Sequence, residues 1–448
     1  MGQSVSDRSR YAAHARIVAD EHRLPDNAPV TSSLRSLQER FTIRMCQQPT
    51  GTESGITKGA MLQFSIYLSM VYADPKLFEN NAGWPASPSK YDPAVGERSV
   101  DVLFEQAQLA EDLGFDMVSV SEHHSWPINQ ASNPAVLAAA ISQRVKKLRI
   151  ALMGPLAAIN NPVRIAEEVA MLDAITKGRI SLMPLRGTPN EFVSYGINPD
   201  ETRGRTREAQ ALIERALNEP EPFSWEGRYY RFPTVAVWPG QSQQPIPIWS
   251  SGNSEGSVVY AARNKYRLGI SFYPLPMAAE LTKLYRAEAQ KAGWQPTPHD
   301  ILYRSYVACA DTDTAADELE ARYYGNLGLG PSMMGRASAV MNAMELTKIS
   351  ADRAPAAEIG TDADGKNMSK DAESKFALGD LHFKGSPTTM IEQFTEWYET
   401  AGIGVFDCGF SGGGLTAEET NTSLKLFGTE VIPSIKHLGT DKITEDIR

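Results

Sequence analysis

Apolar and polar residues alternate along much of the chain in a way that is typical of strands separated by helices. Residues 62–70 show the strict alternation of a half-buried strand. Strands are expected near residues 62–70, 116–124, 148–153, 179–183, 246–250, 267–272, 301–309 and 404–408. Glycine or proline marks the short connections to segments of helical periodicity, so eight strand–helix units can be counted. This order predicts an α/β protein with a parallel sheet.

The helices that separate the strands have their own boundary signals. Four helices are expected at residues 97–113, 162–176, 201–217 and 417–427. Three more are expected to begin at residues 134, 254 and 314, and another is expected to end at residue 292. Pro162 suits a first helical position, and Lys177-Gly178 is a typical stop signal. Residues 223–238 are an exception, because their pattern predicts a β-hairpin outside the main sheet.

The alternating pattern occupies residues 61–436. Two segments lie outside this range, and a third interrupts the pattern within it. Residues 1–60 are polar and bear arginines, and we expect an N-terminal extension that is disordered, an oligomer contact or the result of an upstream start. Residues 326–384 form a long insertion after the seventh strand, either a lid over the catalytic face or a solvated spacer. Residues 437–448 are expected to be a C-terminal tail.

Composition narrows the possible function classes. The 448 residues are 42% hydrophobic and 22% charged, which is enough for a large core. A net charge of −10 disfavours nucleic acid or an anionic membrane surface as the partner. Cys46, Cys309 and Cys408 show no C-x-x-C spacing, so neither a disulfide framework nor a metal site is predicted, and a reducing cytoplasm is the expected location. No stretch reaches the roughly 18 to 20 apolar residues that span a bilayer.

The richest chemistry follows the second expected strand. Residues 116–124 bring Glu122, His123 and His124 to the carboxyl end of that strand. Parallel α/β proteins place their active sites at this end of the sheet. An imidazole can donate or accept a proton near neutral pH, so both histidines are candidate catalytic groups. The alternative is that they cap the strand or satisfy a hydrogen bond in the core.

Several blocks of sequence together carry a family resemblance. They are LGFD at 113–116 with EHH at 122–124, NP at 133–134, NPVR at 161–164, LD at 172–173, KGR at 177–179, RG at 186–187 with EF at 191–192, GSP at 385–387, AGI at 401–403 and KLF at 425–427. Over roughly residues 61–436 the chain resembles the bacterial luciferase-like, flavin-dependent monooxygenase family. The resemblance implies a TIM (β/α)8 barrel that carries the N-terminal extension and the insertion after its seventh strand.

The resemblance also implies roles for single residues around a flavin. His123 matches the catalytic histidine beside the reactive edge of reduced flavin, and His124 is its companion. The Met153–Gly154 bond matches a non-proline cis peptide beneath the flavin ring, with an ordinary trans turn before Pro155 as the alternative. Four aromatic residues are expected to form an apolar substrate wall or simply to pack: Tyr67, Trp126, Trp249 and Phe272.

The phosphate end of the cofactor is expected where the fifth strand leads into a helix. There Asn253, Ser254 and Ser257 would gather hydroxyls and amides at a helix amino end, which favours an anion. The resemblance adds Arg186 and Arg203 as phosphate-binding cations, whereas Arg205 and Arg207 are expected to be surface charges. The alternative is a serine that caps an ordinary helix.

The resemblance implies an FMN-dependent two-component monooxygenase. Such an enzyme takes reduced FMN (FMNH2) from a separate NAD(P)H:flavin reductase and oxygenates an apolar or carbonyl-containing small organic substrate with O2 through a C4a-peroxyflavin. No Gly-x-Gly-x-x-Gly motif follows a strand, so a dinucleotide site within the chain is not predicted. Family members are commonly dimers, which implies a homodimer. The alternatives are an F420-dependent oxidoreductase and a catalytically silent flavin-binding subunit.

Overall fold

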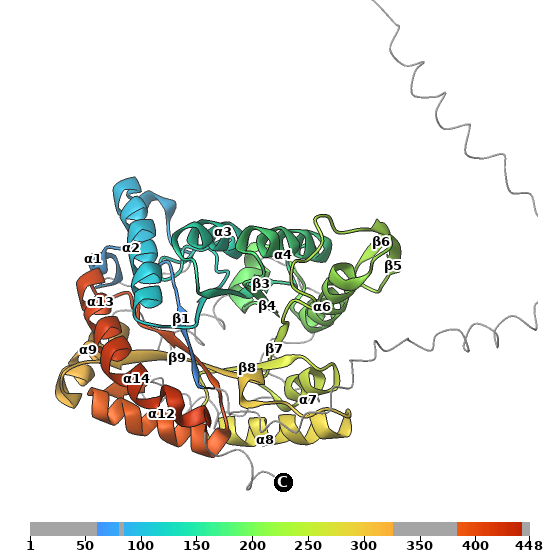
Figure 1. Ribbon diagram of the computed structural model, residues 1–448. Coiled ribbons are helices and arrows are strands. Elements are labelled where there is room, and N and C mark those ends of the chain that lie inside the picture. Colours follow the sequence, from blue (N-terminus) through green and yellow to red (C-terminus); the bar gives the residue numbers. More distant parts are fainter. Residues whose placement is uncertain (1–60, 80–84, 326–382, 441–448) are drawn as a thin grey trace, which may run out of the picture. The chain divides into compact units, whose positions relative to one another are not determined.

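Eight parallel strands form the wall of a barrel in the order β4-β3-β2-β1-β11-β9-β8-β7 (Figure 1). The computed structural model describes residues 61–79, 85–325 and 383–440. The wall strands are β1 (Gln63–Tyr67), β2 (Met117–Val120), β3 (Arg149–Leu156), β4 (Ile180–Leu185), β7 (Trp249–Ser251), β8 (Arg267–Ser271), β9 (Ile301–Cys309) and β11 (Val405–Gly409). A parallel bridge between Leu182 of β4 and Ile248, beside β7, brings the two ends of the sheet together. The predicted TIM barrel is therefore confirmed.

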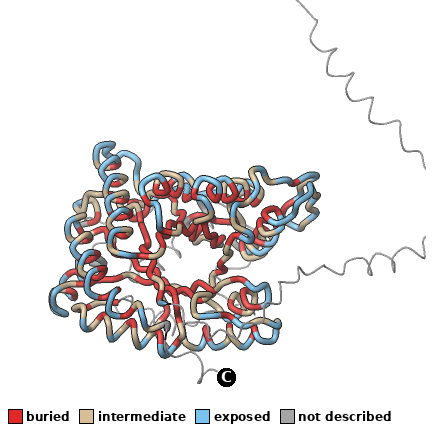
Figure 2. Tube along the Cα trace, in the orientation of Figure 1, coloured by how far each residue is buried: buried red, intermediate tan, exposed pale blue. Residues whose placement is uncertain are grey.

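Helices surround the strands, with their buried sides facing inward and their exposed sides facing solvent (Figure 2). The longer ones are α2 (Pro93–Asp112), α3 (Pro134–Arg144), α4 (Pro162–Thr176), α6 (Thr202–Asn218), α7 (Glu255–Arg263), α8 (Leu275–Lys291), α9 (Asp313–Gly325), α12 (Pro387–Ala401) and α13 (Ala417–Leu426); α1 (Pro75–Glu79), α5 (Pro189–Ser194) and α14 (Ile432–Ile435) are short. Asp92, Asn133, Asn161 and Ser386 cap helices whose first residue is proline. No helix among these residues is long and apolar enough to cross a membrane.

The structure departs from the predicted boundaries where local signals were overlooked. Helix α2 begins at Pro93, because the Asp92 side chain accepts the Ala94 N–H. The elements that were not predicted include β10 (Phe383–Gly385), which pairs with β9, the long helix α12 and the short helices α1, α5 and α14. Strand β10 takes the last residues of the insertion expected at 326–384, and a 3-10 helix (Lys436–Thr440) occupies the start of the expected tail.

The other predicted accessory segments have mixed outcomes. The hairpin expected at 223–238 is confirmed by the antiparallel pair β5 (Phe223–Glu226) and β6 (Arg231–Val235). The extension at 1–60, the insertion at 326–382 and the tail at 441–448 lie outside the described residues.

A buried ion pair lies inside the barrel, on the inward-facing side of β9 and β11. Arg304 Nε donates to Asp407 Oδ2 at 2.6 Å, and Arg304 Nη2 donates to Ser119 Oγ at 3.1 Å. Ser119 in turn donates to Asp407 at 2.8 Å, and the guanidinium lies 4.1 Å from the centroid of the Tyr67 ring. Burial lowers the pKa of Arg304, but Asp407, Tyr67 and Tyr306 together raise it by more. Each charge is therefore held by the other.

We predict that Asp407→Asn lowers the free energy of unfolding by about 3 to 5 kcal/mol, because it leaves the Arg304 charge buried without its partner. The double variant Arg304→Met/Asp407→Leu should recover most of this loss, as both charges are then gone. Urea unfolding measures both. Arg98→Ala is the control: it breaks an exposed ion pair with Glu105 and should cost at most about 1 kcal/mol. An Asp407→Asn loss no larger than the control loss would contradict the assignment.

Candidate active site

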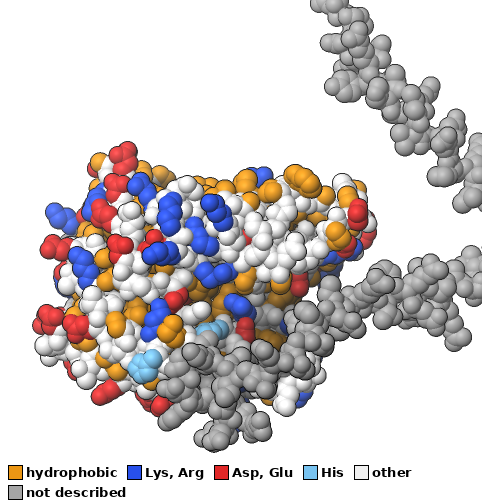
Figure 3. Space-filling model, in the orientation of Figure 1, with side chains coloured by type: hydrophobic (Ala, Val, Ile, Leu, Met, Phe, Trp, Pro, Cys, Tyr) orange, Lys and Arg blue, Asp and Glu red, His pale blue; other side chains and the backbone are white. Residues whose placement is uncertain are grey.

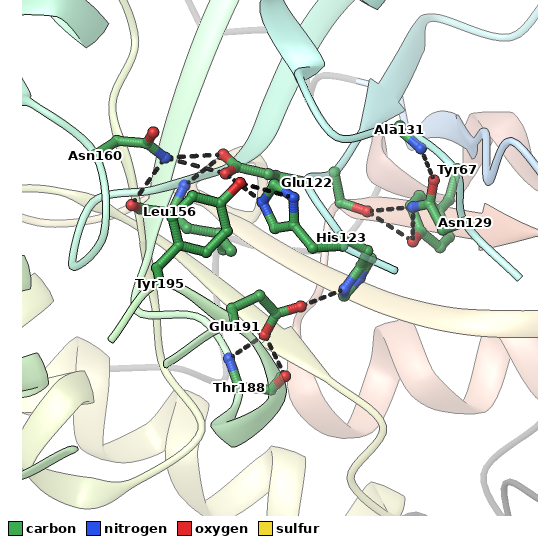
Figure 4. Close-up of polar contacts among 12 residues, drawn as sticks. Tyr67, Glu122, His123, Asn129, Ala131, Leu156, Asn160, Thr188, Glu191 and Tyr195 are labelled. Carbon is green, nitrogen blue, oxygen red and sulfur yellow. Dashed lines mark hydrogen bonds and ion pairs between the residues drawn. The ribbon is translucent and has the colours of Figure 1, made fainter. Parts of the chain in front are cut away.

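His123 and His124 come shortly after β2, which ends at Val120, and their imidazoles contact two different carboxylates, those of Glu191 and Glu122 (Figure 4). His123 Nδ1 lies 3.1 Å from Glu191 Oε1, and His124 Nε2 lies 2.9 Å from Glu122 Oε1. Both carboxylates are buried, with 3% and 5% of the Glu191 and Glu122 side chains exposed. A carboxylate can only accept a hydrogen bond, so the ring nitrogen that contacts it is the one that carries the proton of a neutral imidazole. His123 therefore carries Nδ1–H and His124 carries Nε2–H.

Glu191 is itself held in place by the loop after β4. Its Oε2 accepts the Thr188 N–H at 2.7 Å and a short hydrogen bond from the Thr188 hydroxyl. Burial raises the pKa of Glu191, but its hydrogen bonds with His123 and Thr188 lower it by more, so the net direction is down. The carboxylate thus stays anionic and orients His123, whose side chain is 24% exposed.

Glu122 forms the centre of a second group, behind His124. Its carboxylate accepts the Leu156 N–H at 2.9 Å and the Asn160 amide at 3.0 and 3.2 Å. On the other side of the ring, His124 Nδ1 lies 3.1 Å from the Tyr195 hydroxyl, and the two rings are 4.7 Å apart. Three hydrogen-bond donors, from Leu156, Asn160 and His124, thus satisfy and orient this buried carboxylate.

Polar contacts with β1 hold the loop that carries the histidines. The Tyr67 hydroxyl lies 2.8 Å from Ser121 Oγ, which also accepts the Asn129 amide at 3.0 Å. Asn129 Oδ1 accepts the Ala131 N–H, and the Ala131 carbonyl accepts the His123 N–H at 3.1 Å. The network therefore fixes the backbone of His123 as well as its ring.

Two of the four predicted wall residues, Tyr67 and Trp126, are found at the histidine loop. Trp126 meets His123 edge to face at 5.8 Å, and Phe272 stacks on Tyr306 at 5.1 Å. Tyr67 and Tyr306 both border Gly409, where a Cβ would come within 3.2 and 2.9 Å of their rings. Trp249 lies elsewhere, with 2% exposed, in the buried interior cluster that includes Met153.

The predicted cis peptide at Met153–Gly154 is not found. Cis bonds in the described part of the chain are Trp238–Pro239 and Gln244–Pro245. Gly154 instead has a φ of +129°, a conformation that is open to glycine, and its carbonyl accepts the Glu122 N–H at 3.0 Å. A Cβ at this position would lie 3.0 Å from Leu185 Cδ1. Gly154 lies within β3, where the pairing with β4 is irregular between Met153 and Leu156, and its peptide bond with Met153 is trans.

The predicted cations, Arg186 and Arg203, lie near each other, and Arg207 contacts the first turn of α7. Burial by surrounding protein lowers the pKa of Arg186, and the nearby charge of Arg203 lowers it further. Arg203 and Arg207 lie one turn apart on α6, so they share a face. Arg207 Nη2 approaches the Gly256 carbonyl in the first turn of α7 at 3.4 Å. Arg207 was expected to be a surface charge only; it is exposed but contacts α7.

The predicted serines begin α7 as a reciprocal cap. Ser254 Oγ accepts the Ser257 N–H at 3.4 Å, Ser257 Oγ accepts the Ser254 N–H at 3.0 Å, and the two hydroxyls are 3.0 Å apart. Asn253 points elsewhere, because its amide bonds to Ser271 at the end of β8. A capped amino end beside guanidinium groups suits an anion, and a cap alone would also explain the serines.

Histidine, charged and hydrophobic side chains meet at the centre of the face in Figure 3. Glu122 and Asn160 line a cavity of about 70 Å3. A larger pocket of about 560 Å3 lies between α9 and α13, beside Cys309, and contains none of the predicted site residues. Among the described residues no His, Cys, Asp and Glu cluster could hold a metal ion.

Sequence reasoning missed the partners of the two histidines. Glu191 and Tyr195 follow β4, the wall strand next but one to β2, so their place at the same barrel end could have been inferred. Which side chain meets which imidazole could not, because these contacts span 68 and 71 residues. The sequence analysis also missed Arg304 and Tyr306, because it treated residues 301–309 only as a strand of the barrel wall.

The family model for luciferase-like monooxygenases matches residues 81–404. The chain is 26% identical over 353 residues to an alkanal monooxygenase alpha chain of Photorhabdus luminescens, covering 75% of this chain and 91% of that protein. It is also 29% identical over 184 residues to an uncharacterized protein of Sinorhizobium fredii, covering 41% of this chain and 53% of that protein.

Two solved structures share the fold. One is the oxygenating constituent of 3,6-diketocamphane monooxygenase from Pseudomonas putida, a type II Baeyer–Villiger monooxygenase in complex with FMN: TM-score 0.59, 21% identity, covering 84% of this chain and 99% of that chain. The other is an F420-dependent secondary alcohol dehydrogenase with TM-score 0.59 and 17% identity, covering 84% of this chain and 99% of that chain.

Proposed function

Because the chain belongs to the luciferase-like monooxygenase family, we propose that it is the oxygenase of a two-component system. It would accept reduced FMN from a separate NAD(P)H:flavin reductase and use O2 to oxygenate an apolar or carbonyl-containing small organic substrate. The observation that carries this proposal is the hydrogen bond between His123 Nδ1 and the buried carboxylate of Glu191 at the carboxyl end of the barrel. Active sites of this fold lie at that end.

The residues near α7 suit the phosphate of FMN. The amino end of α7 offers amide groups and two serine hydroxyls, and Arg186 lies close enough to Arg203 for their charges to repel. A doubly charged phosphate between them would relieve that repulsion. Bound reduced FMN would supply the electrons that activate O2.

The protein itself would control protons and water at the reacting atoms. With Glu191 on Nδ1, His123 presents Nε2 to a ligand and can hold or return a proton there. Trp126 provides apolar surface beside the His123 ring. Such surface favours an apolar substrate and keeps water away from the reaction.

Cofactor titration separates this proposal from its two alternatives. Under anaerobic conditions we expect tight binding of reduced FMN and weak binding of reduced F420. Turnover with a flavin reductase, NADH and 18O2 should then place 18O in a product from a panel of ketones, aldehydes and aromatics. Preference for F420 would favour a hydride-transfer enzyme, as in one structural neighbour. Flavin binding without labelled product across the panel would favour a silent subunit.

We predict that His123→Ala retains reduced FMN but loses about 100-fold to 10,000-fold in the rate of 18O incorporation, because the proton-handling imidazole is gone. Glu191→Gln should lose at least about tenfold, since its amide can donate to Nδ1 and impose the other tautomer. Flavin affinity serves as the control in both variants. An undiminished rate in His123→Ala would refute the catalytic assignment.

We predict that Arg203→Ala weakens reduced FMN by about 10-fold to 100-fold and leaves reduced riboflavin nearly unchanged, because only FMN has the phosphate. Equilibrium titrations of both flavins measure this. Arg215→Ala is the matched control on the same helix, because Arg215 pairs with Glu219 and lies over the Phe223 ring. Equal losses for FMN and riboflavin would exclude the phosphate role.

A further inference from the structure

A carboxylate, an imidazole and a phenol stand in line beside the proposed flavin site. Glu122 Oε1 contacts His124 Nε2 at 2.9 Å, and His124 Nδ1 contacts the Tyr195 hydroxyl at 3.1 Å (Figure 4). Glu122 is 5% exposed and His124 is 9% exposed, whereas Tyr195 is 48% exposed. The line therefore runs from a buried carboxylate to the phenol of a partly exposed residue that follows Glu191 on the same segment.

This line is separate from the one that serves His123. His123 uses Glu191 and its Nδ1 atom, whereas His124 uses Glu122 and its Nε2 atom. The neighbouring histidines thus present opposite ring nitrogens, His123 Nε2 and His124 Nδ1, away from their carboxylates. The Tyr195 hydroxyl contacts His124 Nδ1. The His123–Glu191 pair and the Tyr195–His124–Glu122 line can therefore each exchange a proton with a ligand by a separate route.

We propose that Tyr195 is a second proton-transfer residue of the site, supported by His124 and Glu122. The inference rests on the proposed function and adds a residue to it. A ligand O–H or N–H gives its proton to the Tyr195 oxygen while the Tyr195 O–H proton passes to His124 Nδ1. The products are the ligand anion, a neutral phenol and an imidazolium held against the Glu122 carboxylate. The reverse transfer returns the proton, so charge and atoms balance in each direction.

The surroundings of Tyr195 favour a neutral phenol that relays protons over a resident phenolate. Burial raises the pKa of Tyr195, and the negative charges of Glu122 and Glu191 raise it further. The imidazolium formed at His124 is stabilised by Glu122, whose carboxylate is fixed by Leu156 and Asn160. The titratable groups that face the line are thus Glu122, His124 and Glu191, with His123 on the far side of Glu191.

Tyr195→Phe tests the inference, because it removes the hydroxyl but keeps the ring on His124. We expect unchanged affinity for reduced FMN and a loss of about 10-fold to 100-fold in the turnover rate with the reductase, NADH and O2. Tyr91→Phe is the matched control at an exposed tyrosine outside the site. An unchanged rate in Tyr195→Phe would overturn the proposal, while loss of flavin binding in the wild-type protein would instead overturn the proposed function.

Fluorotyrosine at position 195 separates proton transfer from a structural role. Fluorination lowers the pKa of the phenol but barely changes its size, so the limb of the pH–rate profile that depends on Tyr195 should move to lower pH. His124→Gln should abolish this movement, because the phenol then has no imidazole to receive its proton. A pH profile that does not respond to fluorination would show that Tyr195 only packs against His124.

Discussion

Two buried carboxylates, Glu122 and Glu191, determine the geometry of the site, because each holds one of two neighbouring imidazoles. A buried carboxylate needs hydrogen-bond donors, and here Leu156, Asn160 and Thr188 supply most of them. The remaining acceptor positions are filled by His123 and His124. The requirement to satisfy these charges thus orients both rings and fixes the nitrogen that each presents to a ligand.

The barrel brings the parts of this site together from distant segments. Strands β2 and β4 end at the same edge of the wall, so the histidine loop meets the loop of Glu191 and Tyr195 there. The arginine-bearing amino end of α6 meets the serine-capped amino end of α7, where Arg207 donates to the Gly256 carbonyl. The proposed function uses both features, with proton control at the histidines and an anion site at α7. The same end of the barrel would then bind both the phosphate and the isoalloxazine ring of the flavin.

The sequence predicted the strands and the position of the histidines well, because alternation, helix caps and Pro162 are local signals. Helix α4 and strand β9 were both predicted at their observed bounds.

The predictions failed where a contact joins residues far apart in the chain, or where one residue could adopt more than one local conformation or environment. The pairing of Arg304 with Asp407 joins residues 103 apart, and no local pattern indicates it. At Gly154 the family resemblance implied a cis bond, whereas the peptide bond is trans and the residue has a positive φ at an irregularity of β3. Trp249 is of a residue type that often lines substrate pockets, but it packs inside the barrel.

An anaerobic crystal structure with reduced FMN tests the central claim most directly. We expect the isoalloxazine ring within hydrogen-bond distance of His123 Nε2, with Glu191 still on Nδ1, and the phosphate between Arg186, Arg203 and the first turn of α7. A flavin bound elsewhere, or a His123 ring turned away from it toward the protein interior, would contradict the account.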